Sequence, residues 1–209
     1  MESIAERHPN LGREKVWCTI DGLKLYLQAA PNCTIQERFY NGWTHDHYVT
    51  NVMVFCPDGT IAIAAFNCPG SFHDSTVAEY GDIYKKMEEM YNKYGGKCTA
   101  DSAFREKDYP FLIKSSQDPL TATGTTREEV ELNVRLQVEA TSMRQSAEWG
   151  MRAVQSSFPR LKGRLLYEDK GERGMILHST FLLYNLQTRL IGINQIPEDI
   201  HAVSDYRCQ

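Results

Sequence analysis

Three acidic residues that lie far apart along the chain are the strongest candidates for chemistry in this sequence: Asp21, Asp101 and Glu148. If folding brought them together, three carboxylates would repel one another unless divalent cations neutralised them, and hard oxygen ligands of this kind suit magnesium or manganese. Two such ions held about 3.5–4 Å apart can activate a water or hydroxyl and stabilise the leaving oxygen of a phosphodiester. The trio therefore predicts phosphodiester chemistry with two Mg²⁺ or Mn²⁺ ions as cofactors.

Asp21 lies inside a run, residues 16–27, whose β-branched, aromatic and apolar composition is typical of a strand. Alternation of side chains along a strand places Asp21 on a face that is expected to be buried. The other members of that face would be Trp17, Leu23, Leu25 and Leu27. A carboxylate taken out of water must be paired, hydrogen-bonded or bound to a cation. The alternative interpretation is that the strand ends at Ile20 and that Asp21 begins an ordinary Asp-Gly turn.

Glu148 lies on a predicted long helix, one position away from its apolar stripe and between Arg144 and Arg152. The plain interpretation is a solvated helix face with two i,i+4 ion pairs, each worth a few tenths of a kcal/mol. Gly150 argues against an ordinary helix face, because a glycine inside a helix costs about 1 kcal/mol relative to alanine. Its presence favours a close approach of another group at this turn.

The elements that must position these acids follow from the hydrophobic period and from the turn residues. The Asp-Gly dipeptide at 58–59 predicts a hairpin, and apolar residues three or four apart predict helices. The strand that ends at Asp101 follows a helix, so it should run parallel to the strand it joins, and ligands gather at the carboxyl ends of parallel strands. In order, the expected elements are strands at 16–28, 48–56, 60–67, 97–101 and 111–114, and helices at about 74–94, 126–158 and 172–190.

The bulk properties narrow the class of protein. With 209 residues and 42% apolar content, the chain can bury a single core, and residues 1–15 are expected to be a loose, charged lead-in. With a net charge of −4 the chain as a whole is not basic, so any binding of nucleic acid depends on local basic patches. The six cysteines show no metal-ligand spacing and are interpreted as reduced and intracellular. Neither a signal peptide nor a membrane span is expected.

Short motifs spread over residues 16–196 are each weak alone but specific in combination. They are Thr19–Gly22, Phe39–Trp43, Pro57–Gly59, Pro69–Ser75, Thr99–Ser102, Arg144–Gly150 and Leu161–Arg164. In these motifs the sequence resembles the DDE superfamily endonucleases of the PIF/Harbinger transposase type. The resemblance implies an α/β, ribonuclease H-like fold with a mixed five-stranded sheet flanked by helices, spanning residues 16–196 and followed by a tail at 197–209. It also implies that Asp21, Asp101 and Glu148 are catalytic and hold the metal ions that cut DNA and, in active transposases, join strands.

Further candidate site residues lie outside the acidic trio. The helix that follows His73 and Asp74 needs a cap, which explains both residues without catalysis; by resemblance they orient a metal ligand or the scissile phosphate. Several cations late in the chain are interpreted as a strip that contacts DNA phosphates, with a solvated basic face as the equal alternative. They are Arg144, Arg152, Arg160, Lys162 and Arg164.

The expected function is a metal-dependent DNA endonuclease or transposase core. The main alternative is a transposon-derived scaffold that has lost the chemistry and binds DNA or protein, and a third is a nuclease that acts on RNA or a hybrid. The helical DNA-binding region that usually precedes the catalytic core in this family is not among the residues before the first strand, so a separate DNA-binding protein is an expected partner. The resemblance implies a location in the nucleus, and the oligomeric state stays open.

Overall fold

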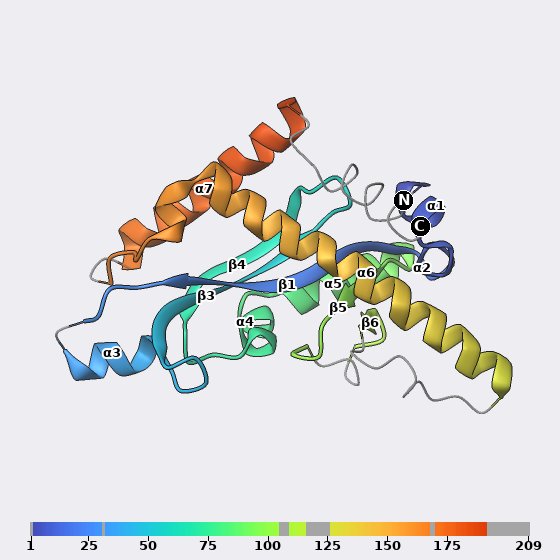
Figure 1. The fold of residues 1–209 in the computed structure, drawn as a ribbon, viewed down its shortest axis with the longest axis horizontal. Coiled ribbons are helices and arrows are strands. Elements are labelled where there is room, and N and C mark those ends of the chain that lie inside the picture. The colour runs from blue at the N-terminus through green and yellow to red at the C-terminus, as the bar shows by residue number, and fades with distance from the viewer. Residues whose placement is uncertain (1, 31, 105–108, 116–125, 168–169, 192–209) are drawn as a thin grey trace, which may run out of the picture.

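The computed structural model describes residues 2–30, 32–104, 109–115, 126–167 and 170–191. The strands are β1 (Val16–Tyr26), β2 (Tyr40–Asn41), β3 (Asp46–Phe55), β4 (Ile61–Pro69), β5 (Lys97–Ala100) and β6 (Leu112–Lys114). The helices are α1 (Glu2–Arg7), α2 (Pro9–Arg13), α3 (Cys33–Phe39), α4 (Asp74–Tyr80), α5 (Ile83–Tyr94), α6 (Arg127–Ser157), the 3-10 turn η3 (Pro159–Lys162) and α7 (Lys170–Ile191). This is a mixed α/β chain with a curled sheet flanked by helices (Figure 1). The predicted boundary at 196 and the tail at 197–209 lie outside the described residues.

The sheet joins an antiparallel meander to a parallel pair. β1 pairs antiparallel with β3 and β3 with β4, while β5 runs parallel to β1 and β6 runs parallel to β5. The hairpin between β3 and β4 forms at the predicted Asp-Gly, where Gly59 has φ of 81° and the Asp58 carboxylate accepts from the Thr60 amide. Within the described residues the sheet has six strands instead of the predicted five, because the two-residue β2 pairs with the start of β3.

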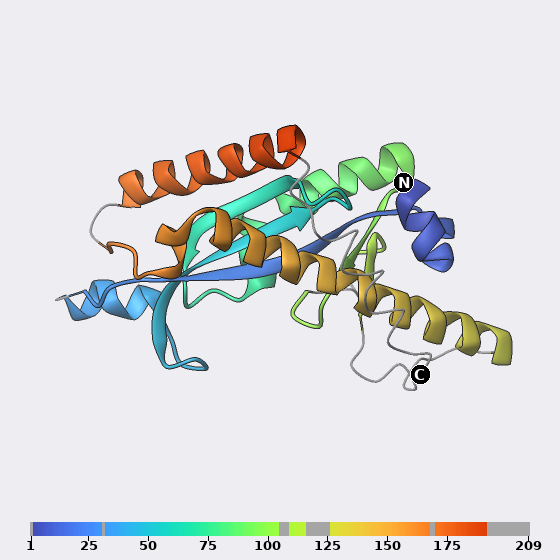
Figure 2. The same cartoon turned by 45° about the horizontal axis from the view of Figure 1, so that its top comes forward.

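Helices cover both faces of this sheet, and each face has its own apolar core. On one face, α4 and α5 contribute Val77 and Met87 to a cluster with Cys18 and Ile20 of β1. On the other face, α6 and α7 pack their apolar side chains against Leu23, Leu25 and Leu27 of β1. Figure 2 shows the long α6 crossing the sheet beside β1 while α7 runs along β4. The face that carries α6 is called the α6 face below.

The predicted single helix at 74–94 is wrong, since the structure breaks it into α4 and α5. Gly81 and Asp82 form the break, and Asp82 adopts a left-handed φ of 56°. A Cβ on Gly81 would lie only 2.2 Å from the Cβ of Ala65 in β4, so this turn is pressed against the sheet. The apolar period continues through both helices, which is why the period alone could not reveal the break.

The predicted loose lead-in is also wrong. Residues 2–13 form α1 and α2, with Leu11 fully buried beside Val16 and Met143. Glu139 of α6 caps α2, because its carboxylate accepts from the amides of Asn10 and Leu11 at 3.0 and 2.9 Å. This long-range cap replaces a local one, so the start of the chain is fixed to α6.

α7 covers the edge strand β4. The Asn185 side-chain amide donates to the Ile61 carbonyl and accepts from the Ile61 amide, both at 2.8 Å. This pairing satisfies the backbone groups of Ile61 on an edge strand, where they would otherwise be open to another strand. No helix within the described ranges is long and apolar enough to cross a membrane, and the five cysteines described are free thiols.

Candidate active site

A bulge in β1 decides which side chains accompany Asp21. The pairing of β1 with β5 shifts register between Val16 and Cys18, so Trp17 packs with the α4 and α5 cluster. The prediction that Trp17 shares a face with Asp21 is therefore wrong. After the bulge the alternation is regular, and Asp21 shares the α6 face with the three leucines of β1, as predicted.

Asp21 is a buried carboxylate in the middle of a continuous strand. β1 runs to Tyr26, so the alternative that Asp21 starts a turn is wrong. Only 8% of the residue is exposed, and the Gly22 amide donates to its Oδ1 at 2.7 Å. The pKa of Asp21 is raised to about 7, and burial is the largest cause; the charges of Asp101 and Asp74 also raise it, while the Gly22 amide and Arg144 lower it. At neutral pH this group is thus poised between its acid and its carboxylate.

Asp101 lies beside Asp21 at the carboxyl end of β5. Thr19 and Thr99 are register partners in the parallel pair, so Asp21 and Asp101, two residues further on, lie at the same level of neighbouring strands. β5 ends one residue before Asp101, whose Oδ1 accepts from the Ala103 amide at 2.8 Å. The predicted position at a parallel strand end is confirmed.

Asp74 brings a third carboxylate near Asp21 and Asp101, from the face of the sheet that α4 covers. It opens α4, and its Oδ2 lies 2.5 Å from the point where a Cβ on Gly22 would be, so only a glycine leaves room for it. Burial and then the charge of Asp101 raise the pKa of Asp74, while Lys24 and His73 lower it. The sequence predicts only a capping or an orienting role for Asp74, and no local pattern indicates its approach to β1. His73 occupies the cap position of α4 without a side-chain capping hydrogen bond.

Glu148 is connected to Asp21 through Arg144, which interacts with both acids. Its Oε1 pairs with Arg144 Nη1 at 3.1 Å, and the same arginine lowers the pKa of Asp21. One residue before it, Ala147 is buried against the sheet, so Glu148 lies at the border of the packed face as predicted. The close approach predicted at Gly150 is confirmed, because a Cβ there would lie 2.8 Å from the Phe55 ring.

The donor set fits a hard divalent cation in its chemistry. Asp21, Asp74 and Asp101 are oxygen ligands, and the charge of Asp101 raises the pKa of the other two, a repulsion that a cation would relieve. Within the ranges the structure describes, however, no three acidic, histidine or cysteine side chains are already arranged to hold a metal ion. Holding an ion therefore requires rotation of these side chains, and for Glu148 the opening of its pair with Arg144.

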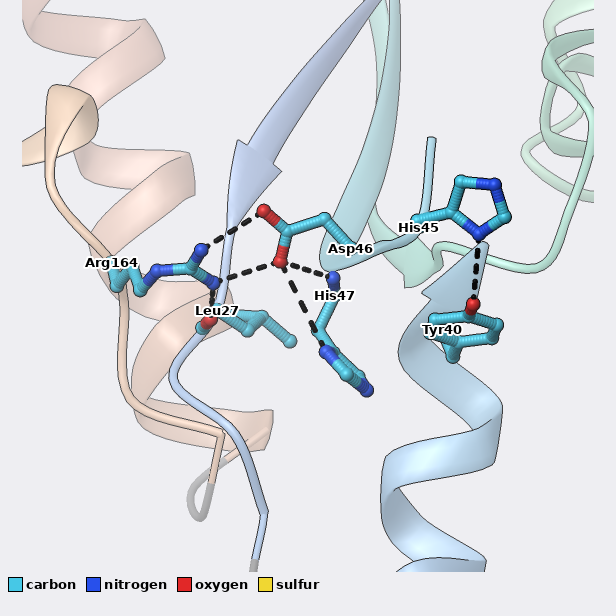
Figure 3. A network of polar contacts seen from close by, with 6 residues as sticks. All are labelled: Leu27, Tyr40, His45, Asp46, His47 and Arg164. Carbon is cyan, nitrogen blue, oxygen red and sulfur yellow. Dashed lines mark hydrogen bonds and ion pairs between the residues drawn. The ribbon is translucent and has the colours of Figure 1, made fainter. Parts of the chain in front are cut away.

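The cations predicted to contact phosphates fall into two groups. Arg152, Arg160 and Lys162 are exposed near the carboxyl end of α6 and in η3. Arg164, by contrast, is engaged: its two terminal nitrogens donate to the Asp46 carboxylate at 2.9 Å each, and Nη1 also donates to the Leu27 carbonyl at 2.8 Å (Figure 3). Arg164 thus ties the segment after α6 to the starting end of β3.

The same network fixes the turn that leads into β3. The hydrogen bond from Arg164 holds the pKa of Asp46 below its usual range, so this carboxylate stays charged. His45 and Tyr40 face one another with Nδ1 and the hydroxyl 3.2 Å apart, as Figure 3 shows. No local pattern indicates the pairing of Asp46 with Arg164, since it joins residues that are distant along the chain.

The fold and the site together define a mixed α/β domain with clustered carboxylates at the carboxyl end of a parallel strand. The family model described as DDE superfamily endonuclease matches residues 20–185, and the chain belongs to that family. Its members are nucleases, so membership implies nuclease activity in general and DNA as the substrate. No curated protein and no solved structure matches the chain.

Proposed function

We propose that this chain is the catalytic core of a PIF/Harbinger-type transposase, a DNA endonuclease that depends on two Mg²⁺ or Mn²⁺ ions. Asp21, Asp101 and Glu148 are its catalytic and metal-binding residues, and the core spans residues 16–196. The observation that carries the proposal is the pair formed by Asp21, buried on β1, and Asp101 at the end of β5, whose charge contributes to the raised pKa of Asp21.

The sheet supports a ribonuclease H-like fold. β4, β3 and β1 form an antiparallel meander, and β5 and β6 follow β1 in parallel, with a helix leading into β5 and the long α6 packed across β1 and β5. An arrangement of this kind would bring acids on β1, after β5 and on α6 toward one face of the sheet. Fold alone does not imply function, so the acids carry the argument.

The chain's own residues have distinct parts in the proposed reaction. Asp21 on β1 and Asp101 at the end of β5 would provide oxygen ligands once their side chains rotate, and Asp74 would add negative charge from α4. Glu148 completes the set once Arg144 releases it, and the freed guanidinium can then face a phosphate. Bound divalent ions would supply activation of the attacking water and stabilisation of the leaving oxygen.

DNA would lie along the exposed cations Arg152, Arg160 and Lys162. Arg144 would join them at the acids, and Arg164 would hold their segment in place through Asp46. A separate DNA-binding protein would supply target recognition, because the net charge of −4 gives this chain little general affinity for DNA. A DNA substrate of this type implies action in the nucleus.

The test is nicking of supercoiled plasmid by the purified chain with Mg²⁺ or Mn²⁺. We expect nicking by the wild type and its loss, by a factor of at least about 100, in Asp101→Asn, which keeps the shape and removes the charge. The matched control is Asp82→Asn, an exposed aspartate in a left-handed turn that asparagine also accepts. Equal nicking by wild type and Asp101→Asn would refute catalysis by these acids.

One observation favours the second candidate, a scaffold without chemistry. Glu148 already has a partner in Arg144, as an ordinary helix-surface pair would. Calorimetric titration with Mn²⁺ separates the two candidates. Binding that disappears in Asp21→Asn and Asp101→Asn supports the nuclease, whereas a wild type that binds no Mn²⁺ supports the scaffold.

A further inference from the structure

The turn between β2 and β3 presents a tryptophan to solvent. Trp43 is 91% exposed, more than any other large apolar side chain among the residues described. Leaving an indole in water forgoes about 1.5–3 kcal/mol of burial, as for other large apolar side chains. A single exposed apolar residue on a flexible loop would need no explanation. The turn that carries Trp43, however, is fixed by hydrogen bonds.

Hydrogen bonds on both sides of Trp43 fix the turn. The Asn41 carboxamide oxygen accepts from the amides of Trp43 and Thr44 at 3.0 and 3.3 Å. Its nitrogen donates to the Gly70 carbonyl at 2.9 Å, which ties the turn to the loop before α4. His45 adopts a left-handed φ of 54° and faces the Tyr40 hydroxyl. The backbone of the turn is therefore fixed with the indole exposed to solvent. A binding partner would not have to order this backbone.

The base of the turn is joined to the cationic segment. Asp46, three residues after Trp43, forms the two-pronged ion pair with Arg164 that Figure 3 shows. Exposed Arg160 and Lys162 precede Arg164 in the same segment. Trp43 therefore lies at the end of the molecule that also carries cations suited to phosphates.

The immediate surroundings of Trp43 favour a nucleobase over a protein surface. Its chain neighbours are Gly42, which has no atom within 4 Å of where a Cβ would be, and the polar Thr44. Aromatic anchors of protein interfaces are ringed by other contact residues that exclude water. An indole flanked by a glycine and a threonine and near cations instead matches the way single-stranded nucleic acid is held, with bases stacked on aromatic rings and phosphates on basic side chains.

We propose that Trp43 stacks on an unpaired base of the DNA strand that the chain holds. The proposal deepens the proposed function, because it assigns a contact to the same substrate away from the acids. Asp21 pairs with Met53, and Tyr26 pairs with Tyr48 near the turn, so the strands separate the acids from the turn by roughly 17 Å or more. The stacked base therefore lies several nucleotides from the bond that is cut, where melting of the duplex exposes it.

The test measures binding of the full chain to a fluorescein-labelled oligothymidine of about twenty nucleotides and to a blunt duplex of the same length. EDTA is present throughout, so cleavage plays no part. Trp43→Ala should weaken binding of the single strand about fivefold or more, the low end of what loss of one stacked base costs, and Trp43→Phe should weaken it less. The duplex should be bound equally by all. Tyr94→Ala, which removes another exposed aromatic ring, is the matched control and should bind like the wild type.

Tryptophan fluorescence provides the second measurement. The oligothymidine should quench the wild type more than Trp43→Phe, in which Trp17 and Trp149 remain. Equal binding of the single strand by wild type and Trp43→Ala, or equal quenching of wild type and Trp43→Phe, would overturn the assignment. Asp101→Asn should retain the full Trp43-dependent binding, so a failure of the nuclease proposal and a failure of the stacking proposal are distinguishable.

Discussion

Removing the charge of Asp21 should make the folded protein more stable at neutral pH and inactive at the same time. The folded pKa of about 7 lies well above the ordinary value of 3.8, and burial is the main cause. Each pH unit between these values corresponds to about 1.4 kcal/mol, so ionising Asp21 in the folded state costs up to about 4 kcal/mol. The side chain introduced by Asp21→Asn would be uncharged at every pH and could still accept from the Gly22 amide.

The sign of the pH dependence follows from the raised pKa. Below about pH 4 Asp21 is protonated in both the folded and the unfolded state, so Asp21→Asn should leave stability nearly unchanged there. Between about pH 4 and pH 7 the unfolded state loses its proton first, so the wild type loses stability and the variant does not. The advantage of Asp21→Asn should therefore grow to about 2–4 kcal/mol by pH 8.

Urea unfolding in EDTA at pH 5 and pH 8 measures this difference. Asp82→Asn, whose side chain is exposed, should show no change in its difference from wild type between the two pH values. Adding Mn²⁺ at pH 8 should stabilise the wild type by binding the folded state and should leave Asp21→Asn unaffected. The reasoning is refuted if Asp21→Asn is no more stable than wild type at pH 8, or if its advantage is the same at both pH values.

Two further predictions concern the elements that support the site. Gly150→Ala should destabilise the chain by about 1–3 kcal/mol in urea, despite the better helix propensity of alanine, because the buried Phe55 ring fills the space. The control is Gly163→Ala, where the nearest atom lies 3.7 Å away, and it should change stability little. A Gly150→Ala protein as stable as wild type would contradict the packing. Glu139→Ala should cost about 1–3 kcal/mol and expose the first fifteen residues to protease, since it removes the cap of α2. Glu131→Ala, an exposed change on the same helix, should do neither, and unchanged protease resistance in Glu139→Ala would refute the role of the cap.

The part of this site that depends on strand alternation was predictable from the sequence. Asp21 within a strand and Asp101 at a strand end follow from local composition and from the helix that precedes β5. The bulge at Trp17 was not predictable, because a bulge has no signature in the local composition. It nevertheless moves every side chain before it to the opposite face of the sheet.

The contributions of Asp74 and Glu139 depend on how helices dock, which local patterns do not contain. Asp74 looked like a helix cap, and only the packing of α4 over Gly22 brings its charge to β1. Residues 1–15 looked loose because they are charged, yet the acceptor that orders α2 lies on α6, more than a hundred residues later. A buried polar group must have a hydrogen-bond partner. Where that partner lies far along the chain, the local sequence cannot identify it.

The balance of charge around Asp21 depends both on the strand pattern and on the packing of the helices. The strand pattern places Asp21 and Asp101, and helix packing adds Asp74 and Arg144. Three carboxylates from β1, α4 and the end of β5 raise the cost of folding, and Arg144 is a cation that offsets part of it at Asp21. Arg144 also pairs with Glu148, so one arginine connects Glu148 to Asp21. A divalent cation would offset the same repulsion more strongly than a shared guanidinium, and it would free Arg144 and Glu148 together. We therefore expect an added divalent ion to lower the electrostatic cost of folding at Asp21, which is where the proposed chemistry requires the ion.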